Sequence, residues 1–425
     1  MRTVIRSRRV LRSAHQEQPT PGTITVDGHS IVAVDTEPAP GDAVMDVGDR
    51  LVTPAFINGH THLSMCAFRG LGLDALDGNI VYETYFRLEN GLLPEDVRAF
   101  TRMGAYESLL AGVGAVWDHY YYAEAVAAAL TDVGLSGVIA PTLQDLAGPG
   151  VPHLEAQLAA TVAIAQDQKM ADAGVFAALG PHATDTVSDA LWKRIVDLAD
   201  RHGLVMHAHV AQSIEEYVQC VEQLGLTPVE RLDRLGVLDA GAGALMVHGL
   251  YVSHSDLQRL RPDHNVLGYC PFSQIQFGFP AAVEHWWEAG VPFVVGTDAG
   301  ACNDSMSVQQ ELRLLAGGRA FAVTPSPAGV GFRATGALSD ALQLDAERRT
   351  TRRDRGALAA PETLLGTVWA VPGRLHPQLA LGELRPGARA SLCVWDLSHP
   401  ACWPATDPLR ALTFADLGGA LHTLM

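Results

Sequence analysis

The sequence has little positive charge and no long apolar run. Its 425 residues include 30 lysines and arginines against 47 aspartates and glutamates, which gives a formal net charge of −17 at pH 7. Nucleic acids and anionic membrane surfaces are polyanions, so this balance argues against both as main partners. No stretch of about 18 uninterrupted apolar residues is present, which argues against a membrane span.

Cysteine is scarce and scattered. The six cysteines stand at positions 66, 220, 270, 302, 393 and 402, and no two of them form a CxxC pair. The sequence therefore predicts neither a disulfide framework nor a cysteine zinc site, and a reduced, cytoplasmic setting is expected. The arginine-rich residues 1–12 lack the apolar segment of a secretory signal.

The middle of the chain has the pattern of an α/β protein. Apolar residues make up 48% of the sequence and charged residues 18%, so a large core can form and a disordered or fibrous protein is excluded. Between residues 54 and 375, apolar runs alternate with long stretches of helical period. Continuously apolar strands between helices are typical of a parallel sheet covered on both faces. Repetition of this unit predicts a (β/α)₈ barrel, or TIM barrel, over residues 54–375.

Both ends of the chain are rich in short β patterns. Residues 1–53 contain two β-rich runs that flank Asp27 and Gly28, which is a strong hairpin signal, and strand patterns return in residues 376–425. We therefore expect these two segments to build one small β-sandwich-like domain. Residues 325–360 are rich in Gly, Pro and Arg without a clear period, and a long mobile insertion or lid is expected there.

The motif Gly59-His60-Thr61-His62 follows an apolar run. Residues two apart in a strand point to the same side, so two imidazoles spaced in this way can bind one ion. An isolated pair of this kind is as often two core or surface histidines. However, further polar residues also end apolar strands: His207, His209, His248 and Asp298.

The spacing of these residues fits a barrel. His209 follows His62 by 147 residues, which is room for four strand–helix units of roughly 35 residues each. His248 follows after 39 residues, or one unit, and Asp298 after 50, or two shorter units. The candidates then end strands one, five, six and eight, which meet at one mouth. Because His209 lies farther toward the strand end than His207, it is the better ligand, and His207 is expected to be a buried structural histidine.

The ligand types indicate the metal. Three imidazoles and one carboxylate suit zinc, with iron or manganese as alternatives. A second metal usually needs a bridging anion from the middle of the barrel, often a carboxylated lysine. The only two lysines, Lys169 and Lys193, fall in helical stretches. One divalent metal is therefore expected.

With these motifs the chain resembles the amidohydrolase superfamily, and more narrowly the branch of S-adenosylhomocysteine, guanine and cytosine deaminases and triazine hydrolases. The likeness covers nearly the whole chain. The segments that carry it are 54–62 (PAFINGHTH), 180–183 (GPHA), 209–212 (HVAQ), 247–249 (VHG), 296–304 (GTDAGACND) and 382–390 (GELRPGARA).

The resemblance implies four metal ligands: His60, His62, His209 and Asp298. It implies that a metal-bound hydroxide attacks an electron-poor C–N carbon of an N-heterocycle, as in an aminohydrolase acting on cyclic amidines. Asp298 would also take a proton from the bound water, and His248 would orient that water or polarise the leaving group. His182 matches a histidine that faces the substrate. Glu89 loosely matches an acid that holds a ribose, although a solvated acid at a helix end is the simpler interpretation.

One position departs from the pattern of this branch. Many of its deaminases carry HxxE at strand five, where the glutamate protonates a ring nitrogen and shuttles a proton to the leaving amine. The corresponding residue here is Gln212. An amide donates and accepts hydrogen bonds but does not titrate, so Gln212 can hold a substrate without acting as a general acid.

Three explanations of Gln212 compete. Glu215 or Glu216, about one turn later, supplies the missing proton. Alternatively, Asp298 and His248 manage all proton transfers on a substrate that needs less help. In the third explanation deaminase activity has been lost. We favour the second, with Gln212 as a substrate-binding amide.

Two further residues are expected at the substrate. Tyr120 ends the second strand, where its ring can stack on a planar ligand or pack beneath a loop. Gln274 follows the seventh strand, in a loop that borders the substrate in relatives.

Other functions stay open. A ring-opening hydrolase of a cyclic amide or imidazolone would use the same residues and release no ammonia. A non-catalytic scaffold that retained the fold would explain Gln212, but it would not need the complete ligand set. The expected partners are a small heterocyclic molecule and further copies of the chain in a homo-oligomer such as a homodimer.

Overall fold

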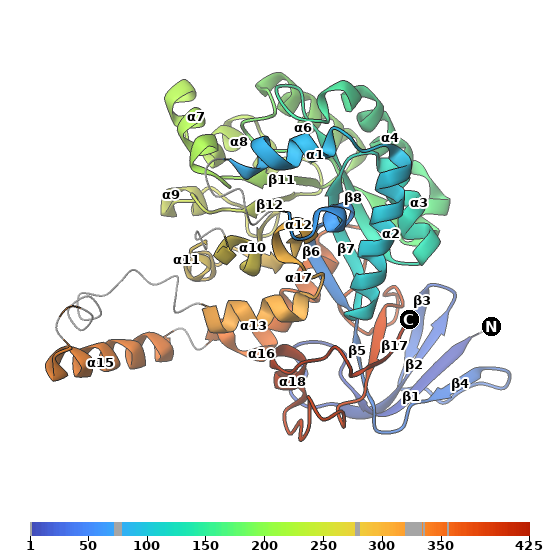
Figure 1. Ribbon diagram of the computed structural model, residues 1–425. Helices are drawn as coiled ribbons and strands as arrows, with labels where there is room; N and C mark the ends of the chain where they lie inside the picture. Colours follow the sequence, from blue (N-terminus) through green and yellow to red (C-terminus); the bar gives the residue numbers. More distant parts are fainter. Residues whose placement is uncertain (1, 72–78, 277–280, 319–333, 335, 355–356) are drawn as a thin grey trace.

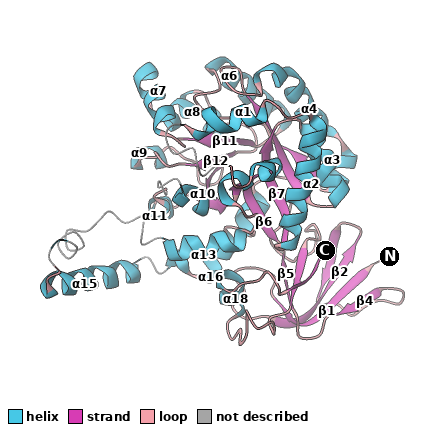
Figure 2. Cartoon of the chain, viewed as in Figure 1, coloured by secondary structure: helices cyan, strands magenta, loops and turns pink. Residues whose placement is uncertain are grey.

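The computed structural model describes residues 2–71, 79–276, 281–318, 334, 336–354 and 357–425. Strands wrapped by helices form the larger part of the molecule, and a smaller sheet beside it contains both chain ends (Figure 1). Colouring by secondary structure shows the helices on the outside of the larger part (Figure 2).

The smaller sheet has seven strands drawn from both ends of the chain, in the order β17-β16-β5-β1-β2-β3, with β4 paired to β1. The strands are β1 (Thr3–Val10), β2 (Thr20–Asp27), β3 (Ser30–Val34), β4 (Ala43–Asp46), β5 (Leu51–Pro54), β16 (Leu392–Trp395) and β17 (Leu421–Leu424). β2 and β3 pair antiparallel around Gly28, whose φ is +59°, so the predicted hairpin is confirmed. The segment boundaries and the sandwich-like form of this sheet stay predictions.

The larger part is built on parallel strands. They are β6 (Phe56–His62), β7 (Val113–Tyr120), β8 (Ser136–Leu143), β9 (Val175–Ala177), β10 (Gly180–Pro181), β11 (Met206–Val210), β12 (Ala244–His248), β13 (Asn265–Tyr269), β14 (Phe293–Val295) and β15 (Asp298–Ala299). Parallel pairing runs from β6 through β8 to β9 and β10, crosses a Leu179–Met206 bridge to β11, and continues to β14. β15 then pairs with β6, which brings the path back to its start.

Helices follow most of these strands. They are α1 (Phe86–Glu89), α2 (Pro94–Leu110), α3 (Ala123–Val133), α4 (Leu154–Gln166), α5 (Gln168–Ala173), α6 (Asp189–His202), α7 (Ile214–Leu224), α8 (Pro228–Arg234), α9 (His254–Leu257), α10 (Pro271–Gln276), α11 (Val283–Glu288), α12 (Gly300–Asn303), α13 (Val308–Gly318), α15 (Leu338–Asp354), α16 (Pro361–Gly366), α17 (Ala370–Arg374) and α18 (Pro408–Phe414). Helical segments of the 3₁₀ type are η1 (Leu63–Phe68), η3 (Val151–His153), η4 (Val237–Asp239) and η5 (Ala357–Ala359), and η2 (Val81–Tyr85) is a π-helix.

Helix α6 shows how the sequence sets these boundaries. The Ser188 hydroxyl accepts the backbone N–H of Leu191, and Gly203 ends the helix in the left-handed region at φ +61°. The buried face has helical spacing and consists of Leu191, Trp192, Ile195 and Ala199. The buried face packs α6 into the core. The Ser188 cap fixes the residue at which the preceding loop ends and the helix begins.

The last strand of the path is interrupted between β14 and β15. Gly296 lies so close to β6 that a Cβ atom there would stand 2.6 Å from the backbone nitrogen of His60. Buried Asn58 bridges the interruption, because its Nδ2 donates to Thr297 Oγ1 at 2.7 Å and its Oδ1 accepts the Thr297 N–H at 3.1 Å. These contacts fix Asp298 beside the end of β6.

The segment 325–360 lies partly outside the described residues. Residues 338–354 of this segment form α15, a helix that the sequence pattern did not indicate, and the expected mobile insertion or lid stays a prediction. Figure 1 shows α15 standing away from the strands and their surrounding helices. Across the described parts of the chain, no helix has the combination of length and apolarity needed to cross a membrane.

Trp395 joins the two parts of the molecule, which gives a test of the fold. Its side chain is 1% exposed, its ring centroid lies 5.7 Å from that of Phe56, and its Nε1 donates to Thr53 Oγ1 at 2.9 Å. Trp395→Ala should lower the free energy of unfolding by about 3–5 kcal/mol, because it leaves a cavity. Urea unfolding followed by circular dichroism measures this. The matched control is Trp403→Ala, since Trp403 is 71% exposed; equal losses in the two variants would contradict the described packing.

Candidate active site

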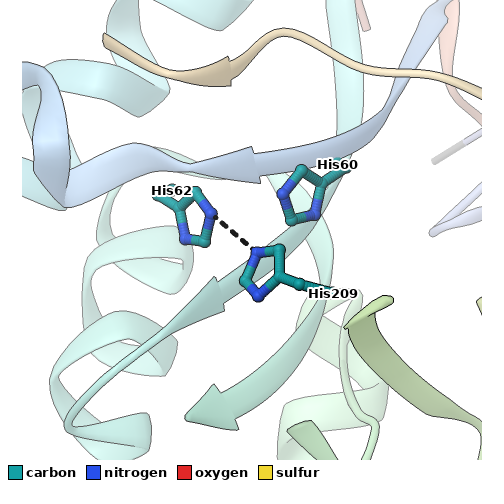
Figure 3. A group of neighbouring side chains, drawn as sticks. All are labelled: His60, His62 and His209. Atoms are coloured by element: carbon teal, nitrogen blue, oxygen red, sulfur yellow. Dashed lines mark hydrogen bonds between the residues drawn. The ribbon is translucent and has the colours of Figure 1, made fainter. Parts of the chain in front are cut away.

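Five side chains of types that can bind a metal meet at the carboxyl ends of the parallel strands. They are His60 and His62 of β6, His209 of β11, His248 at the end of β12 and Asp298 at the start of β15. One ligand atom from each of His60, His62 and His209 lies within 4.8 Å of the others, and the same holds for His60, His248 and Asp298. Figure 3 shows the first three imidazoles facing a common point. The strands that carry these residues are the ones the spacing predicted.

The hydrogen bonds of the outer ring nitrogens fix the tautomers of two imidazoles. Nδ1 of His62 faces the backbone carbonyl oxygen of His119, and Nδ1 of His209 faces that of His182 at 2.9 Å. A carbonyl oxygen only accepts, so each Nδ1 carries the proton and each Nε2 carries a lone pair. Burial lowers the pKa of both imidazoles, which keeps them neutral near pH 7.

The Nε2 atoms of His62 and His209 nevertheless lie 3.3 Å apart (Figure 3, dashed line). Two lone pairs at that distance repel one another unless a cation lies between them. Asp298 Oδ1 completes the group, at 3.5 Å from His62 Nε2 and 3.7 Å from His60 Nε2. Ligands held at about 2.1 Å by one tetrahedral zinc ion lie about 3.4 Å from one another. The four candidate ligands therefore fit a single zinc ion.

His207 positions His60 from the side away from this group. Its Nε2 lies 2.8 Å from His60 Nδ1, and both rings are fully buried. Nε2 of His60 has no hydrogen-bond partner among the described residues. Burial lowers the pKa of this imidazole to about 3. A buried nitrogen without a partner is costly unless it binds a ligand. His207 is thus the buried histidine that the sequence predicted, and it orients a candidate metal ligand.

The Asp298 carboxylate is held on both oxygens. Ser273 Oγ donates to Oδ2 at 2.8 Å, and the Ala299 N–H donates to Oδ1 at 2.9 Å. Burial alone would raise the pKa of Asp298, but the surrounding imidazoles of His60, His248 and His62 hold it well below its ordinary value. The carboxylate is therefore ionised and oriented toward the histidines.

The backbone is strained where the site is formed. Ala211, His248 and Asp298 have φ values of +53°, +81° and +60°. Residues with a side chain rarely adopt this region, and such strain gathers at functional sites where the surrounding structure maintains it. Two of the three residues belong to the metal-binding group.

A cavity of about 380 Å³ opens above the cluster. It lies within the usual size range of small-molecule sites. Its walls include every residue expected at the substrate: His182, Gln212, Tyr120, Gln274 and Glu89.

These five residues differ in what they offer to a ligand. The Gln274 side chain is already engaged, because its Nε2 donates to the His248 carbonyl and its Oε1 accepts the Ala281 N–H. Tyr120 is 1% exposed and meets His62 edge-on at 6.4 Å, so it forms the inner wall. The simpler interpretation of Glu89 as a solvated acid was wrong, because Glu89 is 7% exposed and burial raises its pKa to about 8.

The two glutamates after Gln212 have different positions. Glu216 is buried and turned into the protein, where its carboxylate accepts the N–H groups of Ala211 and Gln212 and the hydroxyl of Thr184. It does not line the cavity. Glu215 is exposed and does line it. Glu216 therefore stabilises the loop that carries Gln212.

Sequence reasoning missed several residues of the site. Ser273 lines the cavity and donates to Asp298, and Asp185 and Tyr82 line it and are joined by a hydrogen bond of 2.8 Å. Asp185 follows His182 by three residues, so its place in a strand-end loop was a usable signal. Tyr82 had none, since it lies in η2, away from any strand.

The chain matches the model of the amidohydrolase family over residues 51–328. A 5-methylthioadenosine/S-adenosylhomocysteine deaminase of Natronomonas pharaonis is 29% identical over 390 residues, 91% of this chain and 83% of the relative. A 5′-deoxyadenosine deaminase of Methanothrix thermoacetophila is 30% identical over 296 residues, 69% of each protein. The solved structure of an adenosine deaminase from Xanthomonas campestris with bound zinc has a TM-score of 0.82 at 22% identity, over 100% of this chain and 91% of that one, which shows a shared fold.

The geometry predicts the metal content. The purified protein should hold about one zinc ion per chain, and a chelator should remove the ion and lower the melting temperature, since bound metal stabilises the folded state. Elemental analysis and thermal unfolding measure both effects. His60→Ala and Asp298→Asn should each reduce zinc content at least about tenfold, because each variant removes one candidate metal ligand. The control is His29→Ala at an exposed turn; unchanged zinc content in both ligand variants would refute the site.

Proposed function

The chain belongs to the amidohydrolase family and is a metal-dependent hydrolase, and on that basis we propose that it removes the exocyclic amino group from a purine nucleoside of the adenosine type. The observation that carries the proposal is the convergence of His60, His62, His209 and Asp298 at the floor of a cavity of about 380 Å³. A cavity of this size accommodates a nucleoside. The named activities of the two relatives support the choice of an adenosine-type ring over other heterocycles.

The reaction replaces the amino group of the ring by oxygen: R–NH₂ and water give R=O, with the remaining proton on the ring nitrogen, and ammonia. A divalent ion held by His60, His62, His209 and Asp298 would lower the pKa of a water molecule and so make it a nucleophile at neutral pH. Asp298, ionised and held by Ser273 and Ala299, accepts the two protons of the attacking water in turn and passes one to the ring nitrogen and the other to the departing amine. His248 donates a hydrogen bond to the oxygen that becomes negative at the attacked carbon.

Gln212 binds the ring in this proposal. It lines the cavity and follows His209 by three residues in the sequence. Its amide can form hydrogen bonds with a ring nitrogen and with a neighbouring donor. Glu216 is engaged with the backbone beneath Gln212, so proton transfer falls to Asp298 and His248. This agrees with the second of the three explanations offered for the departure at this position.

We also infer that the parallel strands and their helices form a (β/α)₈ barrel over residues 54–375, with residues 1–53 and 376–425 as the small β domain. The return of strand pairing from β15 to β6 supports the first inference, and the sheet shared by β5 and β16 supports the second. Cytoplasmic location and a homo-oligomeric state stay predictions from the sequence.

Ammonia release tests the proposed function. Zinc-loaded protein should release ammonia from adenosine-type nucleosides, while His60→Ala and Asp298→Asn should lose at least about 1,000-fold in kcat with unchanged circular dichroism. Product mass distinguishes the other candidates. Addition of water without ammonia release would favour ring opening, and no turnover of purines, pyrimidines, pterins or triazines at full metal occupancy would favour the scaffold.

Gln212 gives a separate test. If its amide binds the ring, Gln212→Ala should raise KM about tenfold and change kcat less than about threefold, because one neutral hydrogen bond contributes roughly 1–1.5 kcal/mol to substrate binding. Steady-state kinetics measure the two constants. Gln219→Ala is the control, since Gln219 lies on the helix α7 that follows Gln212 and does not line the cavity. A loss confined to kcat would instead show a role for Gln212 in proton transfer.

A further inference from the structure

Acidic side chains line the cavity, and no lysine or arginine lines it among the described residues. Its walls include Asp298, Glu89, Asp185 and Glu215. Five histidines also line the cavity, and burial lowers the pKa of each of them, so they are neutral near pH 7.

Asp298 belongs to the metal group, but the other three acids lie apart from it. Asp185 is 9% exposed, its Oδ2 accepts the hydroxyl of Tyr82 at 2.8 Å, and its Oδ1 is buried without a hydrogen-bond partner among the described residues. A buried carboxylate oxygen without a donor is costly, so a ligand that supplies a donor would stabilise it. Burial also raises the pKa of this carboxyl.

Arg231 makes no hydrogen bond to Asp185 and acts on it only through its charge, which affects the pKa of this carboxyl less than its burial and its hydrogen bonds do. Arg231 lies behind the loop, where it binds Asp189 at 2.7 Å and donates to the carbonyl oxygens of Thr184 and Val187. Its donors are therefore directed at groups outside the cavity. Glu216, buried beside Thr184, is a further acid behind the same wall, and burial raises its pKa to about 7.

Asp185 and Glu215 line the cavity outside the metal group, and the charge of Glu215 acts on Asp185, so the two acids are neighbours. His182 contacts the metal ligand His209, with ring centroids 5.0 Å apart, and Asp185 follows it in the loop. Glu215 is exposed at the rim. A substrate whose amino-bearing carbon lies at the metal group would therefore direct its other end toward these two acids, which we call the acidic wall.

We propose that the acidic wall, Asp185 and Glu215, makes the enzyme select nucleosides whose 5′ substituent carries a positive charge and reject those that carry a 5′ phosphate. The proposal rests on the proposed function for the position of the purine ring. Opposite charges a few ångströms apart attract strongly in a partly desolvated cavity, and like charges repel equally. A cationic group also supplies the donor that Asp185 Oδ1 lacks. An adenine nucleotide would instead bring two negative charges against uncompensated carboxylates.

Three ligands that differ only at the 5′ position test this inference: 5′-amino-5′-deoxyadenosine, adenosine and adenosine 5′-monophosphate. Titration calorimetry on the zinc-loaded protein measures Kd, and ammonia release measures kcat/KM. The amine should bind at least about tenfold tighter than adenosine, and the monophosphate at least about 100-fold weaker, as expected for one and two charges beside the acids.

Neutral variants assign the effect to the wall. Asp185→Asn and Glu215→Gln should each reduce the preference for the amine over adenosine about three- to tenfold and should improve relative binding of the monophosphate. Glu215 is exposed, so its variant retains the fold even if Asp185→Asn does not. The matched control is Glu222→Gln, since Glu222 is exposed on the same helix α7 and does not line the cavity.

The two proposals fail separately. If no nucleoside releases ammonia, the proposed function is lost, while the order of the three Kd values still decides the charge preference. Equal Kd values for the amine and adenosine, or a monophosphate that binds as tightly as adenosine, would overturn the inference. A preference that survives in both acid variants would also overturn it, because the charge would then lie elsewhere.

Discussion

The active site depends on the electrostatic conflict between desolvated imidazoles that face one another. Carbonyl oxygens fix the protons of His62 and His209 on the outer nitrogens, so lone pairs meet 3.3 Å apart between buried rings. Protonation would relieve the repulsion, but burial lowers the pKa of these rings. A cation is the remaining solution, and the ionised carboxylate of Asp298 beside the rings supplies compensating charge.

The rest of the fold maintains this arrangement. The ligands come from strands separated by more than 200 residues of chain, and parallel pairing brings their carboxyl ends to one edge. The contact of Asn58 with Thr297 fixes the interrupted last strand against the first, and Gly296 permits the close approach. The strained backbone at His248 and Asp298 is a cost that the surrounding packing offsets, in return for side chains directed at a common point.

Much of this arrangement was predictable because it depends on patterns local in sequence. Strands buried on both faces leave continuous apolar runs, so their carboxyl ends, and with them His60, His62, His209, His248 and Asp298, could be placed by counting strand–helix units. Contacts between distant loops leave no such pattern. The hydrogen bond from Tyr82 to Asp185, the burial of Glu89 and the engagement of Gln274 by backbone groups depend on tertiary structure alone. Helix α15 was missed because it is polar on nearly all sides, so its sequence carries almost no amphipathic period.

The charge of the cavity also gives a physical reason for the departure at Gln212. Glu216 is buried beneath this residue and accepts its N–H, Glu215 lies at the rim, and Asp185 lies in the neighbouring loop. A glutamate at position 212 would place one more carboxyl group beside three acids, and each added like charge raises the cost of burying the others. An amide can donate and accept hydrogen bonds without that cost. The uncharged residue at position 212 and the acidic wall are therefore two parts of one charge distribution, in which the proton chemistry stays at Asp298 and the remaining acids are available to bind the substrate.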